Sequence, residues 1–218
     1  MKKELLCLGL ILVMLASPAH AKKHHKSKKS VVAGPYVVDD FESKTIDKWW
    51  VFGAIKPSFM DNDAKEFPFL ESNSLRLTGN SDGWIIGGLG TPINVNEQQF
   101  NTLKVLMKGI GPNSGSITFE LYEGDAKTGE IQADPNNPGY LSVGKRYIYT
   151  VKVNWIGWRI VIIPLEWFRN DDPKTRNNVV TPKNGKFVQI QLLGIGAPKS
   201  KSMDIMIDRL KFYKEPTP

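Results

Sequence analysis

"YVVDDFESKTIDKWW" (residues 36–50) begins the part of the sequence that determines the fold. It places three carboxylates, Asp39, Asp40 and Glu42, around Phe41, and two adjacent tryptophans follow a few residues later. Such a stretch is compatible with an acidic catalytic site, with a metal site, or with the first strand of a β domain. The rest of the sequence is needed to choose among these three interpretations.

Histidine and cysteine are missing from most of the chain. Between Ser30 and Pro218 the sequence contains neither residue, and the single cysteine is Cys7. Ser-His and Cys-His nucleophilic sites and His-rich zinc sites therefore cannot be built in this part of the chain. A disulfide framework is not expected either.

Short β-branched or aromatic runs alternate with turn residues from residue 36 onward, and helical periodicity is scarce. The predicted strands are 36–41, 49–52, 74–78, 83–86, 102–107, 116–122, 146–153, 157–163, 187–193 and 202–213. Ten short strands at this spacing, with no alternation of strands and helices, indicate an all-β antiparallel β-sandwich or barrel. We find no internal repeat, and we expect one domain over residues 36–214.

The N-terminal segment has the layout of a secretory signal. Two lysines precede an apolar run from Leu5 to Leu15, and the small-x-small triplet Ala19-His20-Ala21 follows. We therefore expect a signal peptide over residues 1–21 and an exported protein, periplasmic or extracellular. Residues 22–35 are expected to form a basic, disordered linker.

The net charge of +7 is concentrated in this linker. The segment "KKHHKSKK", which starts at Lys22 and ends at Lys29, contains five lysines, whereas residues 31–218 carry 22 Lys and Arg against 21 Asp and Glu. Since the charge lies in a tail, specific nucleic-acid binding is not expected. The tail is either a solvated linker or a contact to an anionic envelope surface, to which each lysine would contribute about 1 kcal/mol.

Three predicted strands have one apolar face and one face rich in hydrogen-bonding side chains. Ile117, Phe119 and Leu121 alternate with polar residues, as do Val188, Ile190 and Leu192, and Tyr147, Tyr149, Val151 and Val153. A plain solvated sheet face gives this pattern by default. The polar face is nevertheless rich in planar hydrogen bonders and aromatic area, which suit sugars. The candidate glycan-binding residues are Trp84, Glu120, Tyr122, Arg146, Gln189 and Gln191.

Four segments occur in an order that is typical of a known superfamily: "VVDDFES…WW", "FNTLKVLMKGIG", "GWRIVIIPLEWF" and "MDIMIDRLKFY". Together they resemble the galactose-binding-like β-jelly-roll superfamily, in particular family eleven carbohydrate-binding modules and the complex I intermediate-associated protein domain. The resemblance covers residues 36–213. It implies two antiparallel sheets, a concave face that binds β-glucan or another oligosaccharide, and a structural calcium ion on the opposite side.

The resemblance also implies which residues hold the calcium. Matching the motifs position by position gives Asp40 and Glu42 from the first strand and Asp208 from the last. Carboxylates two apart in a strand project from the same face, and calcium takes six to eight oxygen ligands, so further ligands would be required. The alternative is that the three residues are ordinary solvated acids at strand ends.

Two tryptophan-containing segments are expected to be structural. Trp49 and Trp50 are expected to pack beneath Phe41, and the row Trp158, Ile160 and Ile162 is expected to belong to the core, with ligand contact as the alternative. In the last strand the apolar pattern changes phase near Asp208. A β-bulge, or burial on both faces, would explain this change.

We expect non-catalytic binding of an oligosaccharide or polysaccharide. The alternative is a structural or assembly protein that holds a protein partner through the same sandwich. An enzyme would have to be a glycosidase or lyase that uses carboxylates alone, such as the pairs Asp39-Asp40 or Asp171-Asp172. The glycan and the oligomeric state do not follow from the sequence.

Overall fold

The computed structural model describes residues 34–63, 65–96, 98–125, 127–136, 141–171 and 186–215. The predicted signal peptide (residues 1–21) and the segment from Lys22 to Lys29 lie outside these residues. The part of the chain that the structure describes contains no helix with the length and hydropathy needed to span a bilayer.

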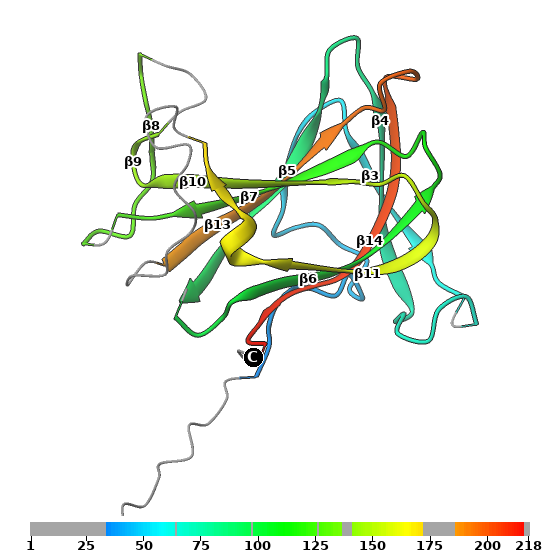
Figure 1. The fold of residues 1–218 in the computed structure, drawn as a ribbon, viewed down its shortest axis with the longest axis horizontal. Helices are drawn as coiled ribbons and strands as arrows, with labels where there is room; N and C mark the ends of the chain where they lie inside the picture. The colour runs from blue at the N-terminus through cyan, green and yellow to red at the C-terminus, as the bar shows by residue number, and fades with distance from the viewer. Residues whose placement is uncertain are drawn as a thin grey trace, which may run out of the picture. The chain divides into compact units, whose positions relative to one another are not determined.

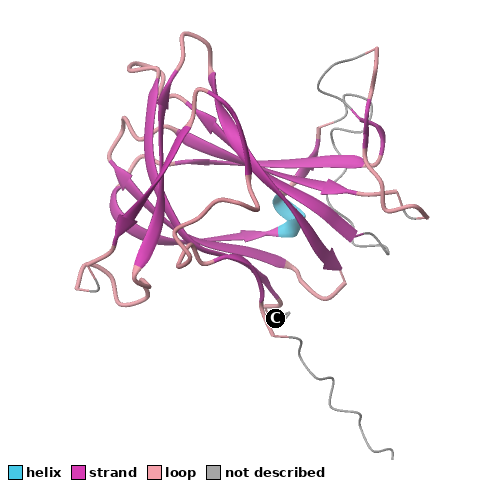
Figure 2. Cartoon of the chain, turned by 180° about the vertical axis from the view of Figure 1, so that it is seen from behind, coloured by secondary structure: helices cyan, strands magenta, loops and turns pink. Residues whose placement is uncertain are grey.

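Two antiparallel sheets form a β-sandwich (Figures 1 and 2). Sheet A has the order β11-β6-β14-β4-β3, with β1 also paired to β14. Its strands are β1 (Tyr36–Asp39), β3 (Lys56–Asp61), β4 (Asn73–Asn80), β6 (Thr102–Ile110), β11 (Ile156–Pro164) and β14 (Ser202–Tyr213). The predicted fold class is therefore confirmed.

Sheet B has the order β12-β10-β7-β13-β5-β2. Its strands are β2 (Trp50–Gly53), β5 (Ile85–Asn96), β7 (Ser116–Glu123), β10 (Lys145–Lys152), β12 (Arg169–Asn170) and β13 (Lys186–Ile195). The short strands β8 (Gln132–Ala133) and β9 (Leu141–Val143) form a separate pair, and the 3-10 helix η1 (Leu165–Trp167) follows β11.

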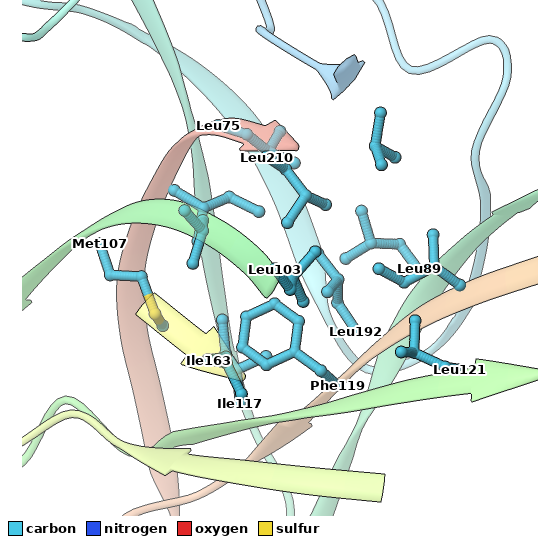
Figure 3. Close-up of a cluster of buried hydrophobic side chains, with 14 of the residues drawn as sticks. Leu75, Leu89, Leu103, Met107, Ile117, Phe119, Leu121, Ile163, Leu192 and Leu210 are labelled. Atoms are coloured by element: carbon cyan, nitrogen blue, oxygen red, sulfur yellow. The ribbon is translucent and has the colours of Figure 1, made fainter. Parts of the chain in front are cut away.

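The hydrophobic core lies between the two sheets. Sheet A contributes Leu75, Leu103, Met107, Ile163 and Leu210, and sheet B contributes Leu89, Ile117, Phe119, Leu121 and Leu192. Figure 3 shows these side chains pointing toward one another from both sheets. The alternation predicted for residues 116–122 is thus confirmed, because Ile117, Phe119 and Leu121 belong to the core and the residues between them do not.

Two apolar rows differ from the prediction. In β13 a register shift between Phe187 and Gln189 makes Val188 half-buried, and Phe187 takes the predicted core position. In β11, Trp158, Ile160 and Ile162 pair with Lys108, Leu106 and Lys104 on the outer face of sheet A. The core side chains of β11 are instead Val161 and Ile163.

The phase change in the last strand has the predicted cause. The register between β14 and β6 shifts between Asp208 and Lys211, and Arg209 adopts a left-handed backbone with φ of 53°. This bulge lets Ile207 and Leu210 both point into the core. Asp208 is completely buried at the bulge.

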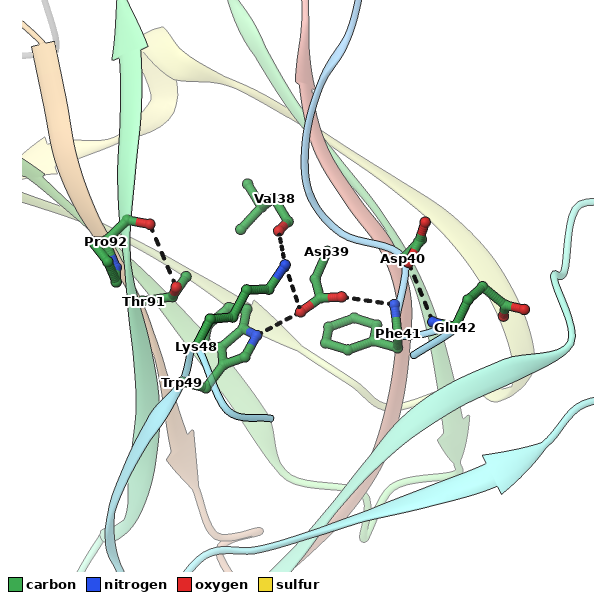
Figure 4. Close-up of polar contacts among 9 residues, drawn as sticks. All are labelled: Val38, Asp39, Asp40, Phe41, Glu42, Lys48, Trp49, Thr91 and Pro92. Carbon is green, nitrogen blue, oxygen red and sulfur yellow. Dashed lines mark hydrogen bonds and ion pairs between the residues drawn. The ribbon is translucent and has the colours of Figure 1, made fainter. Parts of the chain in front are cut away.

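Asp39 occupies the centre of the polar network at the start of the domain (Figure 4). Its Oδ1 accepts a 2.8 Å hydrogen bond from the Phe41 N–H, and its Oδ2 accepts a 2.7 Å bond from the Trp49 indole. Lys48 Nζ lies 3.1 Å from Oδ2 and also donates to the Val38 carbonyl. Since Asp39 belongs to sheet A and Trp49 leads into β2, this carboxylate ties the two sheets together.

Phe41 and Trp49 stack in the core, with ring centroids 6.3 Å apart, as predicted for Trp49. The prediction for Trp50 was wrong. Adjacent residues of a strand point to opposite faces, so burial of Trp49 turns Trp50 outward, where 40% of it is exposed.

Replacing Asp39 by alanine is expected to lower the free energy of unfolding by about 3 kcal/mol, because the buried Trp49 indole N–H loses its acceptor and Lys48 loses its ion-pair partner. Urea denaturation would measure the change. Asp61→Asn is the matched control, since its ion pair with Lys44 is exposed and should matter by less than about 1 kcal/mol. Equal effects of the two substitutions would contradict the role given to Asp39.

Candidate functional site

The outer face of sheet B carries a regular array of side chains. Because Ile117, Phe119 and Leu121 of β7 point into the core, Thr118, Glu120 and Tyr122 point outward. The strand registers align each of them with partners on the neighbouring strands. Three parallel rows result, and each crosses the sheet from β10 toward β2.

The rows follow directly from the pairing. The first contains Arg146, Tyr122, Gln189 and Pro92, the second Ile148, Glu120, Gln191, Gly90 and Trp50, and the third Thr150, Thr118, Leu193, Gly88 and Phe52. Each row therefore has hydrogen-bonding or aliphatic groups on β10, β7 and β13, and the second and third rows end in an aromatic ring on β2.

A hollow of about 520 Å³ lies over these rows. It is lined by Phe52, Trp84, Ile85, Thr118, Glu120, Tyr122, Arg146, Ile148, Thr150, Asp171, Gln191, Leu193 and Ile195. Its size and its mixture of apolar area with a few convergent polar groups are those of a small-ligand site.

The aromatic end of the hollow depends on two glycines. A Cβ on Gly88 would lie 2.6 Å from Cζ of Phe52, and a Cβ on Gly90 would overlap the indole of Trp50. The rings can therefore lie across β5 only because these positions carry no side chain. Phe52 is 37% exposed and Trp84 is 65% exposed, so their apolar area is open to solvent.

The opposite end of the hollow is charged and largely buried. Tyr122 donates a 2.8 Å hydrogen bond to Glu120 Oε2, and Arg146 pairs with Asp171. Burial raises the pKa of Glu120, although the Tyr122 hydroxyl and the Arg146 charge oppose the rise. Asp171 is one of the loop acids considered for catalysis from the sequence, and Asp172 lies outside the described residues.

Most of the predicted glycan-binding residues come together here. Trp84, Glu120, Tyr122, Arg146 and Gln191 line the hollow. Gln189 lies beside Tyr122 in the first row but does not line it. Their contact with sugar remains a prediction.

The sequence analysis missed Phe52 and Trp50 as part of this face. The period of two in "WVF" puts both rings on one side of β2, and the glycines at positions 88 and 90 of "GGLG" provide the space for them. Reading these two patterns together would have identified the aromatic platform.

Buried oxygen atoms without hydrogen-bond donors gather around Asp208. Neither carboxylate oxygen of Asp208 accepts a hydrogen bond of good geometry, although the backbone N–H groups of Glu71 and Arg209 lie close enough to act against the rise of its pKa. Asn73 Oδ1 and Ser74 Oγ also lack a hydrogen bond. Ile207 pairs with Leu75 of β4, so Asp208 and Ser74 occupy the next positions of the two strands. Unpaired buried oxygens are costly, and oxygen atoms of these kinds are calcium ligands.

The other two predicted metal ligands, Glu42 and Asp40, differ from each other in their surroundings. Glu42 Oε1 accepts a 2.7 Å hydrogen bond from the Asn73 N–H, which places Glu42 beside this group. Asp40 is exposed, and its Oδ1 accepts a bond from the Glu42 N–H. No group of three or more His, Cys, Asp and Glu side chains suited to a metal ion occurs within the described ranges. A calcium ligand shell at this place would therefore need oxygen atoms other than carboxylates, and Asn73 Oδ1 and Ser74 Oγ are candidates.

Comparison with solved structures identifies the fold. A family 11 carbohydrate-binding module from Clostridium thermocellum, solved with a β-1,3-1,4-mixed-linked tetrasaccharide, has a TM-score of 0.55 and 16% identity, over 85% of this chain and 98% of that chain. The chain has the β-sandwich fold of the carbohydrate-binding modules. The family 11 module of a cellulosomal cellulase from the same organism has a TM-score of 0.51 and 18% identity, over 85% of this chain and 97% of that chain.

An exo-β-agarase also contains this fold, with a TM-score of 0.54 and 15% identity, but the match covers 84% of this chain and only 25% of the agarase chain. No protein-family model matches the sequence, and no curated protein matches it either. The resemblance to the complex I domain remains a prediction.

The metal-free protein is expected to lose stability through Asp208 as the pH rises. Burial raises the pKa of Asp208 from 3.8 to about 7, so the folded state holds a proton that the unfolded state releases between these values. The loss is absent below pH 4, complete above pH 7, and on the order of 4 kcal/mol.

Asp208→Asn should not show this loss. Urea denaturation of both proteins in a chelator, at several pH values from 4 to 8, measures the difference. Parallel pH profiles of the parent protein and the Asp208→Asn variant would show that ionisation of Asp208 does not destabilise the folded protein.

Proposed function

We propose that the outer face of sheet B binds an oligosaccharide or polysaccharide without catalysing a reaction on it. The observation that carries the proposal is the hollow of about 520 Å³ in which exposed aromatic rings face planar hydrogen-bonding groups across aligned rows. Sugar rings have apolar faces that stack on aromatic side chains and hydroxyl groups that need hydrogen-bond partners.

Each part of the hollow has a role in this proposal. Phe52 and Trp84 stack on sugar rings, while Gln191 and the Thr118–Thr150 pair, whose hydroxyls are 2.8 Å apart, bond to sugar hydroxyls. Arg146 and Glu120 supply charged hydrogen bonds at the other end. Because the rows cross several strands, the ligand would be an extended chain rather than a single sugar.

The structure of the family 11 module with a mixed-linked tetrasaccharide suggests which glycans to test first. That ligand was bound by another protein with the same fold, so β-1,3-1,4-glucans are the starting point for a panel that also includes envelope polysaccharides.

The ion pair of Asp171 and the hydrogen bond of Glu120 support a binding role over a catalytic one. Asp171 is paired with Arg146, and Glu120 accepts the Tyr122 hydrogen bond. A glycosidase needs one carboxyl group to protonate the leaving group and a second to act on the other side of the bond. With both acids held in this way, we expect no release of reducing sugar from any glycan that binds.

We further propose a structural calcium ion at Asp208. The other candidate protein ligands are Glu42 and the side-chain oxygens of Asn73 and Ser74. Asp40 is exposed to solvent, and we do not assign it to this ligand set. A bound cation would compensate the buried charge of Asp208 and connect the residues after β1 to β4 and β14.

Export to the periplasm or the extracellular space, as the sequence predicts, is part of the same proposal, because polysaccharides are accessible there. The segment from Lys22 to Lys29 would then contact an anionic envelope surface or act as a solvated spacer.

Replacing Phe52 or Trp84 by alanine is expected to weaken glycan binding about tenfold each, which corresponds to the loss of one stacking contact. Isothermal titration calorimetry with β-1,3-1,4-glucan oligosaccharides would measure this effect. Trp167→Ala is the matched control, since Trp167 is also exposed but lies outside the hollow.

No binding to a broad glycan panel would overturn the glycan proposal. Capture of a defined protein through Phe52 and Trp84, without glycan affinity, would instead support the structural or assembly role. Equal losses in Trp167→Ala and Trp84→Ala would show that the hollow has no special role.

Calcium is expected to stabilise the domain by about 2.7 kcal/mol at a concentration 100 times its dissociation constant. For a domain of this size, the melting temperature would rise by roughly 5 to 10 °C. Differential scanning calorimetry with and without a chelator would measure the shift. Asp208→Asn should abolish it and Asp40→Asn should leave most of it, whereas a shift that persists in Asp208→Asn would rule out this site.

A further inference from the structure

The outer face of sheet A, opposite the glycan-binding hollow, carries two lysines with no described acidic partner. Lys211 of β14 and Lys104 of β6 are direct cross-strand partners on this face. Like charges directly opposite each other destabilise a sheet. Among the described residues no carboxylate lies within ion-pair distance of either ammonium group, and Lys104 instead lies over the Tyr213 ring at 5.8 Å.

Apolar side chains flank this lysine pair on both sides. Val37 of β1 pairs with Lys211, and Ile162 of β11 pairs with Lys104, so one row reads Val37, Lys211, Lys104 and Ile162. Val37 and Ile162 are both exposed. The row therefore has two cationic side chains in its centre and one apolar side chain at each end, on four neighbouring strands.

A small pocket of about 190 Å³ adjoins this row. It is lined by Phe69, Lys104, Leu106, Ile160, Arg209 and Lys211. Arg209 forms an ion pair with Glu71 at 3.1 Å, whereas neither lysine has an ion pair among the described residues. Phe69 on the rim is 52% exposed. Burial, and then the charges of Arg209 and Lys104, lower the pKa of Lys211, while the charge of Glu71 acts in the opposite direction.

We propose that this face binds the phosphate headgroup of an anionic lipid at a bilayer surface, with Lys104 and Lys211 taking the phosphate and Phe69, Val37 and Ile162 contacting the headgroup-acyl boundary. Cations next to exposed aliphatic and aromatic side chains are the combination that interfacial contacts use. A bound phosphate would also remove the repulsion between the two lysines. The inference does not depend on the proposed glycan binding.

Sedimentation of the full chain with vesicles tests the proposal. Binding is expected to vesicles of phosphatidylcholine mixed with phosphatidylglycerol but not to phosphatidylcholine alone, and it should weaken with salt. The double variant Lys104→Gln/Lys211→Gln should reduce the partition coefficient about thirtyfold, since each lysine contributes on the order of 1 kcal/mol at an anionic surface.

Two matched controls make the result specific. Lys56→Gln/Lys199→Gln removes the same charge from exposed positions outside the pocket and should bind as the parent does. The Lys104→Gln/Lys211→Gln variant should melt at or above the temperature of the parent, because a repulsive pair has been removed, so loss of binding cannot be ascribed to unfolding.

Three results would overturn the proposal. One is the absence of binding that depends on phosphatidylglycerol. A second is unchanged binding of the Lys104→Gln/Lys211→Gln variant while replacement of the five lysines between Lys22 and Lys29 by glutamine abolishes it, which would assign the contact to the tail. The third is a rise in melting temperature with inorganic phosphate that requires Lys104 and Lys211 but no vesicle binding, which would indicate a site for a free oxyanion.

Discussion

The bond from the Trp49 indole to the Asp39 carboxylate joins the end of β1 in sheet A to the start of β2 in sheet B. It holds Trp49 against Phe41 in the core. Since neighbouring residues in a strand face opposite ways, the same bond determines that Trp50 and Phe52 face outward. One buried carboxylate thus connects the packing of the sandwich with the aromatic end of the hollow on sheet B.

The sequence predicts the fold because its strands are short, alternating and separated by turn residues. It fails where a local irregularity changes the phase. The bulge at Val188 moves Phe187 into the core. Most of β5 was not predicted as a strand, because it contains several glycines and Pro92. The proline is tolerated because it pairs with β13 and lies beyond the part of β5 that contacts β2. The phase change near Asp208 could be predicted because apolar residues occur on both sides of it.

The candidate site was predictable in part for a similar reason. Alternation in β7 and β10 places Glu120, Tyr122 and Arg146 on one face without knowledge of the tertiary structure. The position of Asp171 beside Arg146, and of Phe52 beside Gly88, depends on which strands become neighbours. Motif matching selected Asp40 as a metal ligand, which stays a prediction, and gave no role to Asp39, whose buried carboxylate accepts the Phe41 N–H. The left-handed backbone of Phe41, with φ of 59°, cannot be inferred from alternation.

The two outer faces of the sandwich differ in chemistry. The outer face of sheet B combines aromatic rings with planar hydrogen bonders, and the outer face of sheet A combines Lys104 and Lys211, which form no ion pair within the described ranges, with exposed aliphatic groups. Since the sheets are packed back to back through one core, a ligand on one face leaves the other accessible. The polysaccharide and the anionic surface that we propose as ligands would therefore not compete for the same face.

The position of β14 has a consequence for how the chain folds. This last strand lies between β6 and β4 in the centre of sheet A and also pairs with β1. Sheet A therefore cannot assemble until residue 213 is available, and the contacts that complete it join the most distant parts of the sequence. Such long-range pairing makes folding slow, on the scale of milliseconds to seconds, and it leaves the edges of β6 and β4 open until then. A chain interrupted before β14 would retain paired strands of sheet B but would expose two unpaired strand edges, which favour aggregation.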